Sequence, residues 1–266
     1  MVREKTNSIT DSEYARIQDE KAKWQSSGIV FMLRQDFVLR LLGDIRGKRI
    51  LDFGCGVGTL LRNISPGRGA LFHGMDMNAR AMGIASAGQT DNLRFFAGDQ
   101  NSNSLPDAFY DTVICMEIIE HIRDEREVIA FLKRKLKPGG SVIVTVPSRR
   151  KELKLTHFRV YRKDDLRRLF EANGFRTTYL KSYGFPMLRL SLSLFERLNS
   201  LRRKQDEHEV MSMYFFGGVK KKLIYRIMVP FLRKILRLDL LFSPLDFGVG
   251  VVGRFELTQN TSAPSR

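Results

Sequence analysis

The chain has 266 residues, of which 43% are hydrophobic, and it carries a net charge of +16 at neutral pH. This length and hydrophobic content suit one sizeable domain and exclude a chain disordered throughout, while only 2 cysteines argue against a disulfide framework and favour a reducing cytoplasm. No apolar run reaches the ~18 residues of a bilayer-spanning helix, and residues 1–14 lack the apolar core of a signal peptide.

Two helices are predicted at the start of the chain. Residues 11–27 form a polar segment with a few apolar positions, and residues 29–43 repeat apolar side chains at helical spacing until Gly43. We expect residues 1–44 to form N-terminal helices that cover a ligand cleft.

Strands alternate with helices in residues 45–185. Helical periodicity occurs at 78–88, 126–140 and 162–175. Strands are predicted at 48–54, 70–76, 93–99, 109–117, 141–147 and 176–184, with a last strand at 248–258. This alternation implies right-handed crossovers, so the predicted fold class is α/β, with a mostly parallel seven-stranded sheet and helices on both faces.

The strongest local motif is "ILDFGCGVGTLL" at residues 50–61. A strand carries Asp52 into a turn with three alternating glycines, Gly54, Gly56 and Gly58, before a helix begins. Glycines allow a sharp turn and a close approach of the backbone to a ligand, and a helix N-terminus adds free N–H groups. The motif therefore predicts a nucleotide-type binding site.

Two further carboxylates stand at the ends of predicted strands. Asp76 ends the second strand, where a carboxylate suits ribose hydroxyls, and Asp99 ends the third, where it can meet an adenine amino group. Open α/β sheets bind ligands at the carboxyl ends of their strands, so these residues belong to the same predicted site. His73, inside the second strand, is predicted to be a core histidine rather than a ligand.

The ordered motifs "LDFGCGVG", "GMD", "AGDQ", "YDTVICMEIIEHI" and "LKPGGSVIVTVP" resemble the class I S-adenosylmethionine-dependent methyltransferases over residues 45–180. The resemblance implies a Rossmann-like methyltransferase fold with S-adenosylmethionine as the cofactor and S-adenosylhomocysteine as the product. It also implies cofactor-binding residues: Asp52, Gly54, Cys55 and Gly56 around the methionine part, Gly58 at the helix start, Asp76 and Met77 at the ribose and the adenine face, Asp99 and Gln100 at the adenine edge, and Met116 and Glu117 at the methyl group.

The segment "CMEIIEH" at residues 115–121 follows the fourth predicted strand, beside the expected methyl donor. Glu117, Glu120 and His121 are spaced i, i+3 and i+4, so on a helix they share one face. His157, after the fifth predicted strand, is a candidate fourth member of the group. These four residues are candidate ligands for Mg²⁺ or Mn²⁺, which would lower the pKa of a bound hydroxyl.

Two other interpretations of this group stay open. Without a metal, His121, assisted by His157 and Glu120, would be the catalytic base for an acceptor oxygen, while Glu117 serves the cofactor. Alternatively, the group is purely structural. The pattern E-x-x-E-H with a distant histidine resembles O-methyltransferases of ubiquinone biosynthesis and, less completely, 2′-O-methyltransferases of small-RNA ends.

Most of the positive charge lies in the C-terminal part. Residues 1–148 hold 20 Lys and Arg against 18 Asp and Glu, a net +2, whereas residues 149–266 hold 25 against 11, a net +14. Residues 186–247 mix these cations with Leu, Phe and Met, which predicts a basic amphipathic insertion or lid. Such a segment would meet an anionic membrane surface, cover the substrate, or bind RNA. Residues 259–266 are predicted to be a disordered tail.

We therefore expect an S-adenosylmethionine-dependent enzyme that methylates an oxygen of a small or lipid-linked metabolite, in the cytoplasm and at the inner membrane surface. An RNA 2′-O-methyltransferase, a C- or N-methyltransferase on the same fold, and a non-catalytic cofactor-binding partner subunit are the alternatives. No feature of the sequence points to a particular oligomeric state.

Overall fold

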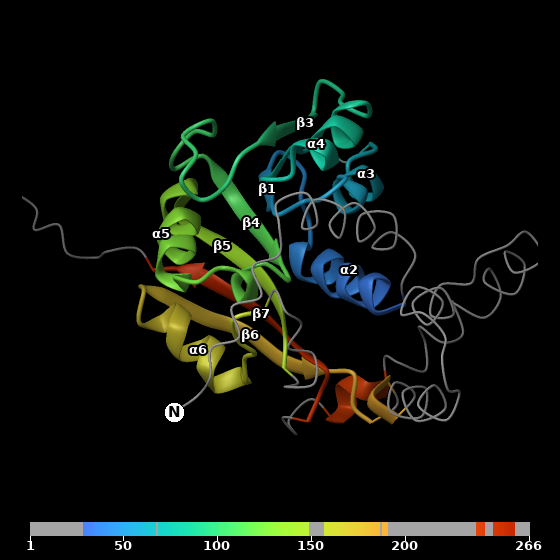
Figure 1. Ribbon diagram of the computed structural model, residues 1–266, viewed down its shortest axis with the longest axis vertical. Coiled ribbons are helices and arrows are strands. Elements are labelled where there is room, and N and C mark those ends of the chain that lie inside the picture. The colour runs from blue at the N-terminus through green and yellow to red at the C-terminus, as the bar shows by residue number, and fades with distance from the viewer. Residues whose placement is uncertain are drawn as a thin grey trace, which may run out of the picture.

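The structure is a computed structural model that describes residues 29–67, 69–148, 157–186, 188–190, 238–242 and 247–258. Its centre is a seven-stranded sheet with the order β3-β2-β1-β4-β5-β7-β6 (Figure 1). The strands are β1 (Arg49–Phe53), β2 (Leu71–Asp76), β3 (Leu93–Ala97), β4 (Tyr110–Met116), β5 (Leu136–Pro147), β6 (Phe175–Tyr183) and β7 (Gly250–Leu257). Strand β7 runs antiparallel to both of its neighbours, β5 and β6, and the other strand pairs of the described sheet are parallel. The predicted α/β class and its mostly parallel sheet are thus confirmed.

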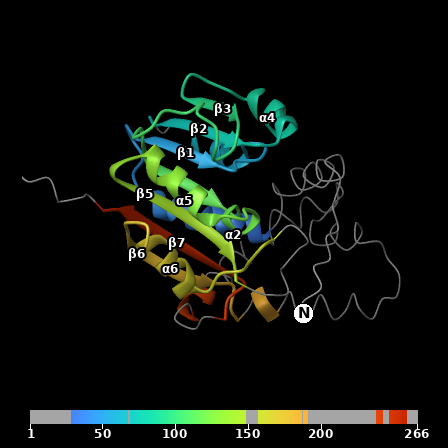
Figure 2. The same cartoon turned by 60° about the vertical axis from the view of Figure 1, so that its left-hand side comes forward.

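Helices cover both faces of the sheet (Figures 1 and 2). Ile50, Ile114 and Ile143 pack in one cluster with α2, α3 and α4, and the residue that follows each of them packs in another cluster with α5 and α6. Because successive strand residues point to opposite faces, apolar side chains at consecutive positions build two cores. The helices are α2 (Ile29–Leu42), α3 (Thr59–Ile64), α4 (Ala79–Ser86), α5 (Glu125–Lys135) and α6 (Lys163–Glu171), with the 3₁₀ turns η1 (Ile119–His121) and η3 (Asp239–Phe242).

The helix predicted for residues 126–140 is shorter than expected, and this corrects the sequence-based boundary. It ends at Lys135, and β5 begins at Leu136 instead of residue 141. Pro138 disfavours helical geometry at the residue before it and has no N–H to donate. The buried Lys135 ammonium also donates to the Leu105 carbonyl at 2.6 Å and to Asp107 at 2.7 Å, which fixes the end of the helix.

Helix α2 lies across the C-terminal half of the sheet. Leu33 and Phe37 of α2 belong to a buried cluster with Tyr183 of β6 and Val252 of β7, and the rings of Phe37 and Tyr183 lie 5.3 Å apart. The helix ends at Leu42, before Gly43 with φ of 61°, as its sequence predicts. This helix therefore connects an N-terminal segment to the last strands of the sheet.

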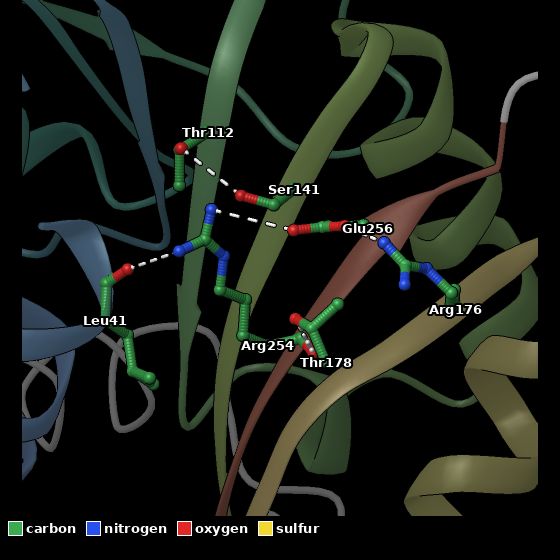
Figure 3. Close-up of polar contacts among 7 residues, drawn as sticks. All are labelled: Leu41, Thr112, Ser141, Arg176, Thr178, Arg254 and Glu256. Atoms are coloured by element: carbon green, nitrogen blue, oxygen red, sulfur yellow. Dashed lines mark hydrogen bonds and ion pairs between the residues drawn. The ribbon is translucent and has the colours of Figure 1, made fainter.

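Polar side chains hold the C-terminal end of α2 against β7 (Figure 3). The Nη1 atom of Arg254 donates to the Leu41 carbonyl at 2.9 Å, which satisfies one of the last carbonyls of the helix. Glu256 pairs with Arg176 of β6 at 2.6 Å and lies 4.0 Å from Arg254. Glu256 is opposite Ser141, which lies near the middle of β5 and is the first β5 residue paired with β7.

Several predictions lie outside the described residues. They concern the helix at residues 11–27, most of the insertion at residues 186–247, and the tail at residues 259–266. Within the part of the chain that the structure describes, no helix combines the length and apolar character needed to cross a membrane.

Candidate active site

The glycine turn after β1 folds over the end of β2. The N–H groups of Gly54 and Cys55 donate to the Met75 carbonyl at 2.7 and 3.0 Å, and the Gly56 N–H donates to Asp76 Oδ2 at 2.8 Å. Since β1 and β2 are adjacent parallel strands, their carboxyl ends meet at one edge of the sheet. The structure therefore brings the glycine motif and Asp76 together, as the sequence predicts.

Backbone conformation explains why this turn needs glycines. Gly54, Gly56 and Gly58 have φ of 79°, 55° and 76°, in the left-handed region that favours glycine. A Cβ on Gly54 would come within 2.0 Å of Ile118 Cδ1, and one on Gly58 within 2.5 Å of the Phe95 ring. The turn is thus shaped for close packing against the loop after β4 and against β3.

Two acids lie beneath this turn. Burial, together with the charge of Asp76, raises the pKa of Asp52 to about 7. Burial also raises the pKa of Asp76, although its carboxylate accepts backbone N–H bonds from Gly56 and Asn78. Two partly desolvated acids favour a cationic ligand, because its charge stabilises their ionised forms. These residues fit the ammonium-bearing methionine part and the ribose of S-adenosylmethionine.

The residues predicted to contact adenine lie beyond β2 and β3. Met77, just after β2, is 66% exposed, so its side chain is accessible for packing against an adenine ring. Asp99 accepts hydrogen bonds from the Asn101 N–H at 2.9 Å and from the Ser102 hydroxyl at 3.3 Å, which closes its own turn. Gln100 is partly exposed in that turn. Contacts of these residues with adenine stay a prediction.

The segment "CMEIIEH" does not form a continuous helix, which corrects the expectation of one shared helical face. Strand β4 ends at Met116, Glu117 has φ of 56°, and only Ile119–His121 form a 3₁₀ turn. The left-handed conformation at Glu117 turns the chain sharply, and its N–H donates to the Thr145 carbonyl at 2.8 Å. Spacing in the sequence therefore does not translate into helical neighbours here.

Glu117 is held by residues of α2 and β5, and a residue of β6 in turn holds the one from α2. Its Oε2 atom lies 2.7 Å from Arg34 Nη2 of α2, and its Oε1 atom accepts from the Thr145 hydroxyl of β5 at 3.1 Å. The Arg34 Nε atom donates to the Tyr183 hydroxyl of β6 at 2.8 Å. The Arg34 and Glu117 side chains are 17% and 19% exposed, so this is a largely desolvated pair.

Glu120, His121 and His157 come together despite their separation in sequence. Each offers one ligand atom, and these atoms lie within 4.8 Å of one another. The His121 and His157 rings are 4.5 Å apart, and His121 Nε2 is 3.8 Å from Glu120 Oε1. Glu120 is fully buried, whereas both histidines are partly exposed. The Phe158 N–H donates to the Glu120 carbonyl at 2.8 Å and brings the His157 loop to this position.

This cluster offers one carboxylate and two imidazoles. Such a mixed nitrogen and oxygen set fits Mn²⁺ better than Mg²⁺, which prefers oxygen ligands. Glu117, the fourth predicted ligand, pairs with Arg34 instead of joining the cluster. A metal role for these residues stays a prediction, as does base catalysis by His121.

The partners of Glu117 were not predicted from the sequence. Thr145 is the one polar residue between apolar neighbours in "VIVTVP", whereas Arg34 is one of four polar residues in "IVFMLRQDFVLRLLG". An isolated polar residue on a buried surface requires a partner, so Thr145 gave an available signal, but nothing in the sequence set Arg34 apart from Gln35, Asp36 and Arg40. Tyr183 had no comparable signal.

His73 is a core residue, as predicted. It is 8% exposed, and its Nδ1 atom lies 2.8 Å from the Tyr110 hydroxyl. Burial lowers the pKa of His73 to about 4, so the ring is neutral at physiological pH. The cluster of Glu120, His121 and His157 does not include it.

Comparisons with known proteins agree with this geometry. A family model described as a methyltransferase domain matches residues 28–180. The ubiquinone biosynthesis O-methyltransferase of Sodalis glossinidius (strain morsitans) is 31% identical over 144 residues, which cover 52% of this chain and 57% of that protein. The chain spans between half and two thirds of the length of the curated relatives it matches.

Solved structures share the fold at low sequence identity. A chain in the complex between the Haloferax volcanii Trm112 methyltransferase activator and a methyltransferase has a TM-score of 0.62 at 16% identity, with 96% of this chain and 100% of that chain covered. Phosphoethanolamine N-methyltransferase 2 of Haemonchus contortus, in complex with S-adenosylmethionine, has a TM-score of 0.54 at 18% identity, with 85% and 52% covered. The chain thus belongs to the methyltransferase domain family, and its fold is that of the class I S-adenosylmethionine-dependent methyltransferases.

Proposed function

We propose that the protein transfers a methyl group from S-adenosylmethionine to an oxygen of a small or lipid-linked acceptor. The observation that carries this proposal is a site with two halves at neighbouring strand ends. Asp52 and Asp76 lie under the glycine turn, and Glu120, His121 and His157 lie after β4 and β5. One half suits a cationic nucleotide-type donor, and the other suits removal of a proton.

On the donor side, the protein mainly binds and orients S-adenosylmethionine. When bound, S-adenosylmethionine supplies a methyl carbon that is open to in-line attack by the acceptor oxygen, with the bond to sulfur breaking and S-adenosylhomocysteine as the leaving group. Asp52 faces the methionine part, and Asp76 accepts from the ribose hydroxyls while it holds the glycine turn. Met77 packs on the adenine face, and Asp99 and Gln100 read its edge. Orientation of this kind supplies much of the rate enhancement of a two-substrate reaction.

On the acceptor side, His121 takes the proton of the acceptor hydroxyl. Glu120 is fully buried beside it, with its Oε1 atom 3.8 Å from His121 Nε2, and helps to orient the imidazole. His157 lines the same space, and Met116 and Glu117 form the wall between acceptor and donor. If Glu120, His121 and His157 instead hold a divalent ion, that ion would lower the pKa of the acceptor hydroxyl.

The acceptor class rests on two observations. The curated relatives carry the name ubiquinone biosynthesis O-methyltransferase, and ubiquinone combines an oxygenated ring with a long apolar chain. In addition, residues 149–266 hold a net charge of +14 among many apolar residues, which suits an anionic membrane surface. We propose that residues 1–44 and 186–247 cover the acceptor, and that the protein works peripherally at the inner face of a membrane.

Two measurements on the whole protein test the central proposal. Calorimetry is expected to show binding of S-adenosylhomocysteine, and its absence would end the methyltransferase proposal. Methyl transfer is then measured with a catechol that carries a farnesyl chain, with plain catechol, and with a short RNA. We expect transfer to the farnesyl catechol first. Transfer to RNA alone would select the RNA methyltransferase alternative, and binding without any turnover would favour a partner subunit.

A second experiment separates base from metal. Under base catalysis, His121→Ala lowers kcat by on the order of a hundredfold and EDTA has no effect. Under metal assistance, EDTA abolishes turnover, and calorimetry with Mn²⁺ shows binding that Glu120→Gln removes. If His121→Ala, His157→Ala and EDTA all leave turnover intact, a C- or N-methyl acceptor replaces the oxygen acceptor.

The membrane proposal has its own test. Liposomes with anionic lipids are expected to float the protein at low salt, and high salt should weaken the association because headgroup attraction is screened. Equal flotation with neutral liposomes would point to apolar insertion, and no flotation would contradict the peripheral location.

A further inference from the structure

Two loops on the acceptor side are joined by hydrogen bonds between their described residues. One follows β4 and contains His121, and the other follows β5 and contains His157. Besides the bond from the Phe158 N–H to the Glu120 carbonyl, the Tyr161 N–H donates to the carbonyl of Pro147, at the end of β5, at 3.1 Å. Tyr161 is thereby held at the end of β5, and the two histidine rings meet where the described part of the second loop begins.

Side chains of the second loop converge on one carboxylate at the start of α5. The Oε2 atom of Glu125 accepts from Arg159 Nη1 at 2.9 Å and from the Tyr161 hydroxyl at 2.5 Å. The Arg159 Nη2 atom also donates to the Arg123 carbonyl at 2.5 Å. The Asp124 side chain caps α5 through the Arg126 N–H, so the helix start that carries Glu125 is itself fixed.

The chemistry of these contacts favours one geometry. A guanidinium has a rigid planar set of donors, so Arg159 can hold a carboxylate and a carbonyl only in a defined orientation. Tyr161 is 4% exposed, which fixes its ring by packing, and burial together with the bond to Glu125 raises the pKa of its hydroxyl, so it remains a donor. Glu125 and Arg159 are about 30% exposed, which limits their effect on global stability.

We propose that Glu125, Arg159 and Tyr161 form a clamp that positions His157 against His121. Arg159 stands two residues after His157, and Glu125 stands four residues after His121, so the clamp closes the loop pair just beyond the two rings. This inference rests on the proposed function, in which the two imidazoles act on the acceptor. In this proposal the three clamp residues act through His157 and not on the donor or the acceptor, so they are positioning residues.

The ring pair can be observed without any turnover. The chain has 4 histidines, so labelled imidazole signals can be assigned with single His→Gln variants. At a ring separation of 4.5 Å, the native protein should give a nuclear Overhauser effect between His121 and His157. We expect this signal to disappear in Arg159→Met and Glu125→Gln, and to weaken in Arg159→Lys, which keeps the charge but not the planar donors.

A matched control is available on α6. Arg167 pairs with Asp164 at 3.1 Å on the exposed face of that helix, so Arg167→Met removes a comparable pair away from the clamp. It should leave the ring signal unchanged. Tyr161→Phe keeps the buried ring and removes one hydrogen bond, and it serves where a stronger variant fails to fold. An unchanged ring signal in folded Arg159→Met, Glu125→Gln and Tyr161→Phe would overturn the clamp.

Kinetics test the consequence for the reaction. With the farnesyl catechol as acceptor, Arg159→Met should lower kcat by on the order of tenfold to a hundredfold, because small misplacements of a reacting group have effects of this size. Its dissociation constant for S-adenosylhomocysteine should stay within about twofold. If the ring signal is lost and kcat is unchanged, the positioning role for catalysis is rejected. If His121→Ala is fully active, it is the proposed base that fails, independently of the ring signal.

Discussion

The donor and acceptor halves of the site are built in different ways. On the donor side, backbone groups of nearby segments dominate, as in the bond from Gly56 to Asp76, which are 20 residues apart. On the acceptor side, side chains join distant segments, as in the bond from Arg34 to Tyr183, which are 149 residues apart. The donor half is thus a local motif, whereas the acceptor half exists only once the whole sheet and α2 have assembled.

This difference has a functional meaning. A backbone-built half tolerates little change, because its glycines have conformations closed to other residues. A half built from side chains can change one contact at a time, which suits a site whose acceptor differs between related proteins. Variants on the donor side should therefore mainly lose affinity for S-adenosylhomocysteine, whereas Arg34 variants on the acceptor side should mainly lose stability.

The largest effect is expected from Asp76→Ala. This change removes a carboxylate that organises the glycine turn through Gly56 and also faces the ribose. Hydrogen bonds to a charged group contribute roughly 1.5–3 kcal/mol each, so the dissociation constant for S-adenosylhomocysteine should rise more than about a hundredfold. Calorimetry checks this, with the exposed Asp91→Ala as the control. A change below about threefold would contradict the donor half.

The next effect is expected from Arg34→Met on the acceptor side. It leaves Glu117 as a largely buried charge without its counter-charge, so the free energy of unfolding should fall by about 2 kcal/mol. The double variant with Glu117→Gln should recover at least half of this loss in urea denaturation. Arg176→Met breaks an exposed pair with Glu256 and should change stability by less than about 0.5 kcal/mol. Equal losses in the two arginine variants would contradict this account.

A pH dependence should distinguish the donor half. Folding raises the pKa of Asp52 from 3.8 to about 7, so this group favours the folded state below about pH 4, and the contribution is lost as the pH rises through 7. A cationic ligand needs the ionised form, so affinity for S-adenosylhomocysteine should fall about tenfold from pH 8 to pH 6. Asp52→Asn should show a flat profile in calorimetry. A native profile that is already flat would contradict a role for Asp52 in cation binding.

A smaller effect than those of Asp76, Arg34 and Asp52 is expected at the C-terminal end of α2. Arg254→Met removes the bond to the Leu41 carbonyl and should lower the free energy of unfolding by about 1 kcal/mol. Affinity for S-adenosylhomocysteine should stay within about twofold. A large loss of affinity would mean that the two halves are coupled through α2, and the contrast drawn between them would then need revision.

The donor half and the sheet could be predicted from the sequence because their signals are local. The motif "ILDFGCGVGTLL" contains its own strand, turn and helix start, and apolar runs mark each strand. The antiparallel strand β7 was predicted as a strand, but its place between β5 and β6 could not be derived from periodicity. Pairing order depends on contacts between distant segments.

The acceptor half could be predicted only in outline. The sequence identified Glu120, His121 and His157 as candidates, and the structure brings their ligand atoms within 4.8 Å. The sequence could not separate Glu117 from these three residues. Glu117 has a left-handed backbone conformation, and the sequence does not mark this conformation when the residue is not glycine. The partners of Glu117 and the clamp around Glu125 depend on how α2 and the loop after β5 dock.

The position of β7 sets an order of events for the growing chain. Within the described sheet, β6 hydrogen bonds only to β7, and β7 in turn is inserted beside β5. During synthesis from the N-terminus, β6 and α6 therefore emerge before the strand that will hold them to the sheet exists. Until residues 250–257 arrive, β5 has an open edge, and Tyr183 cannot take its final place beside Arg34. The acceptor half is thus completed by the strand made last, long after the glycine turn that binds the donor.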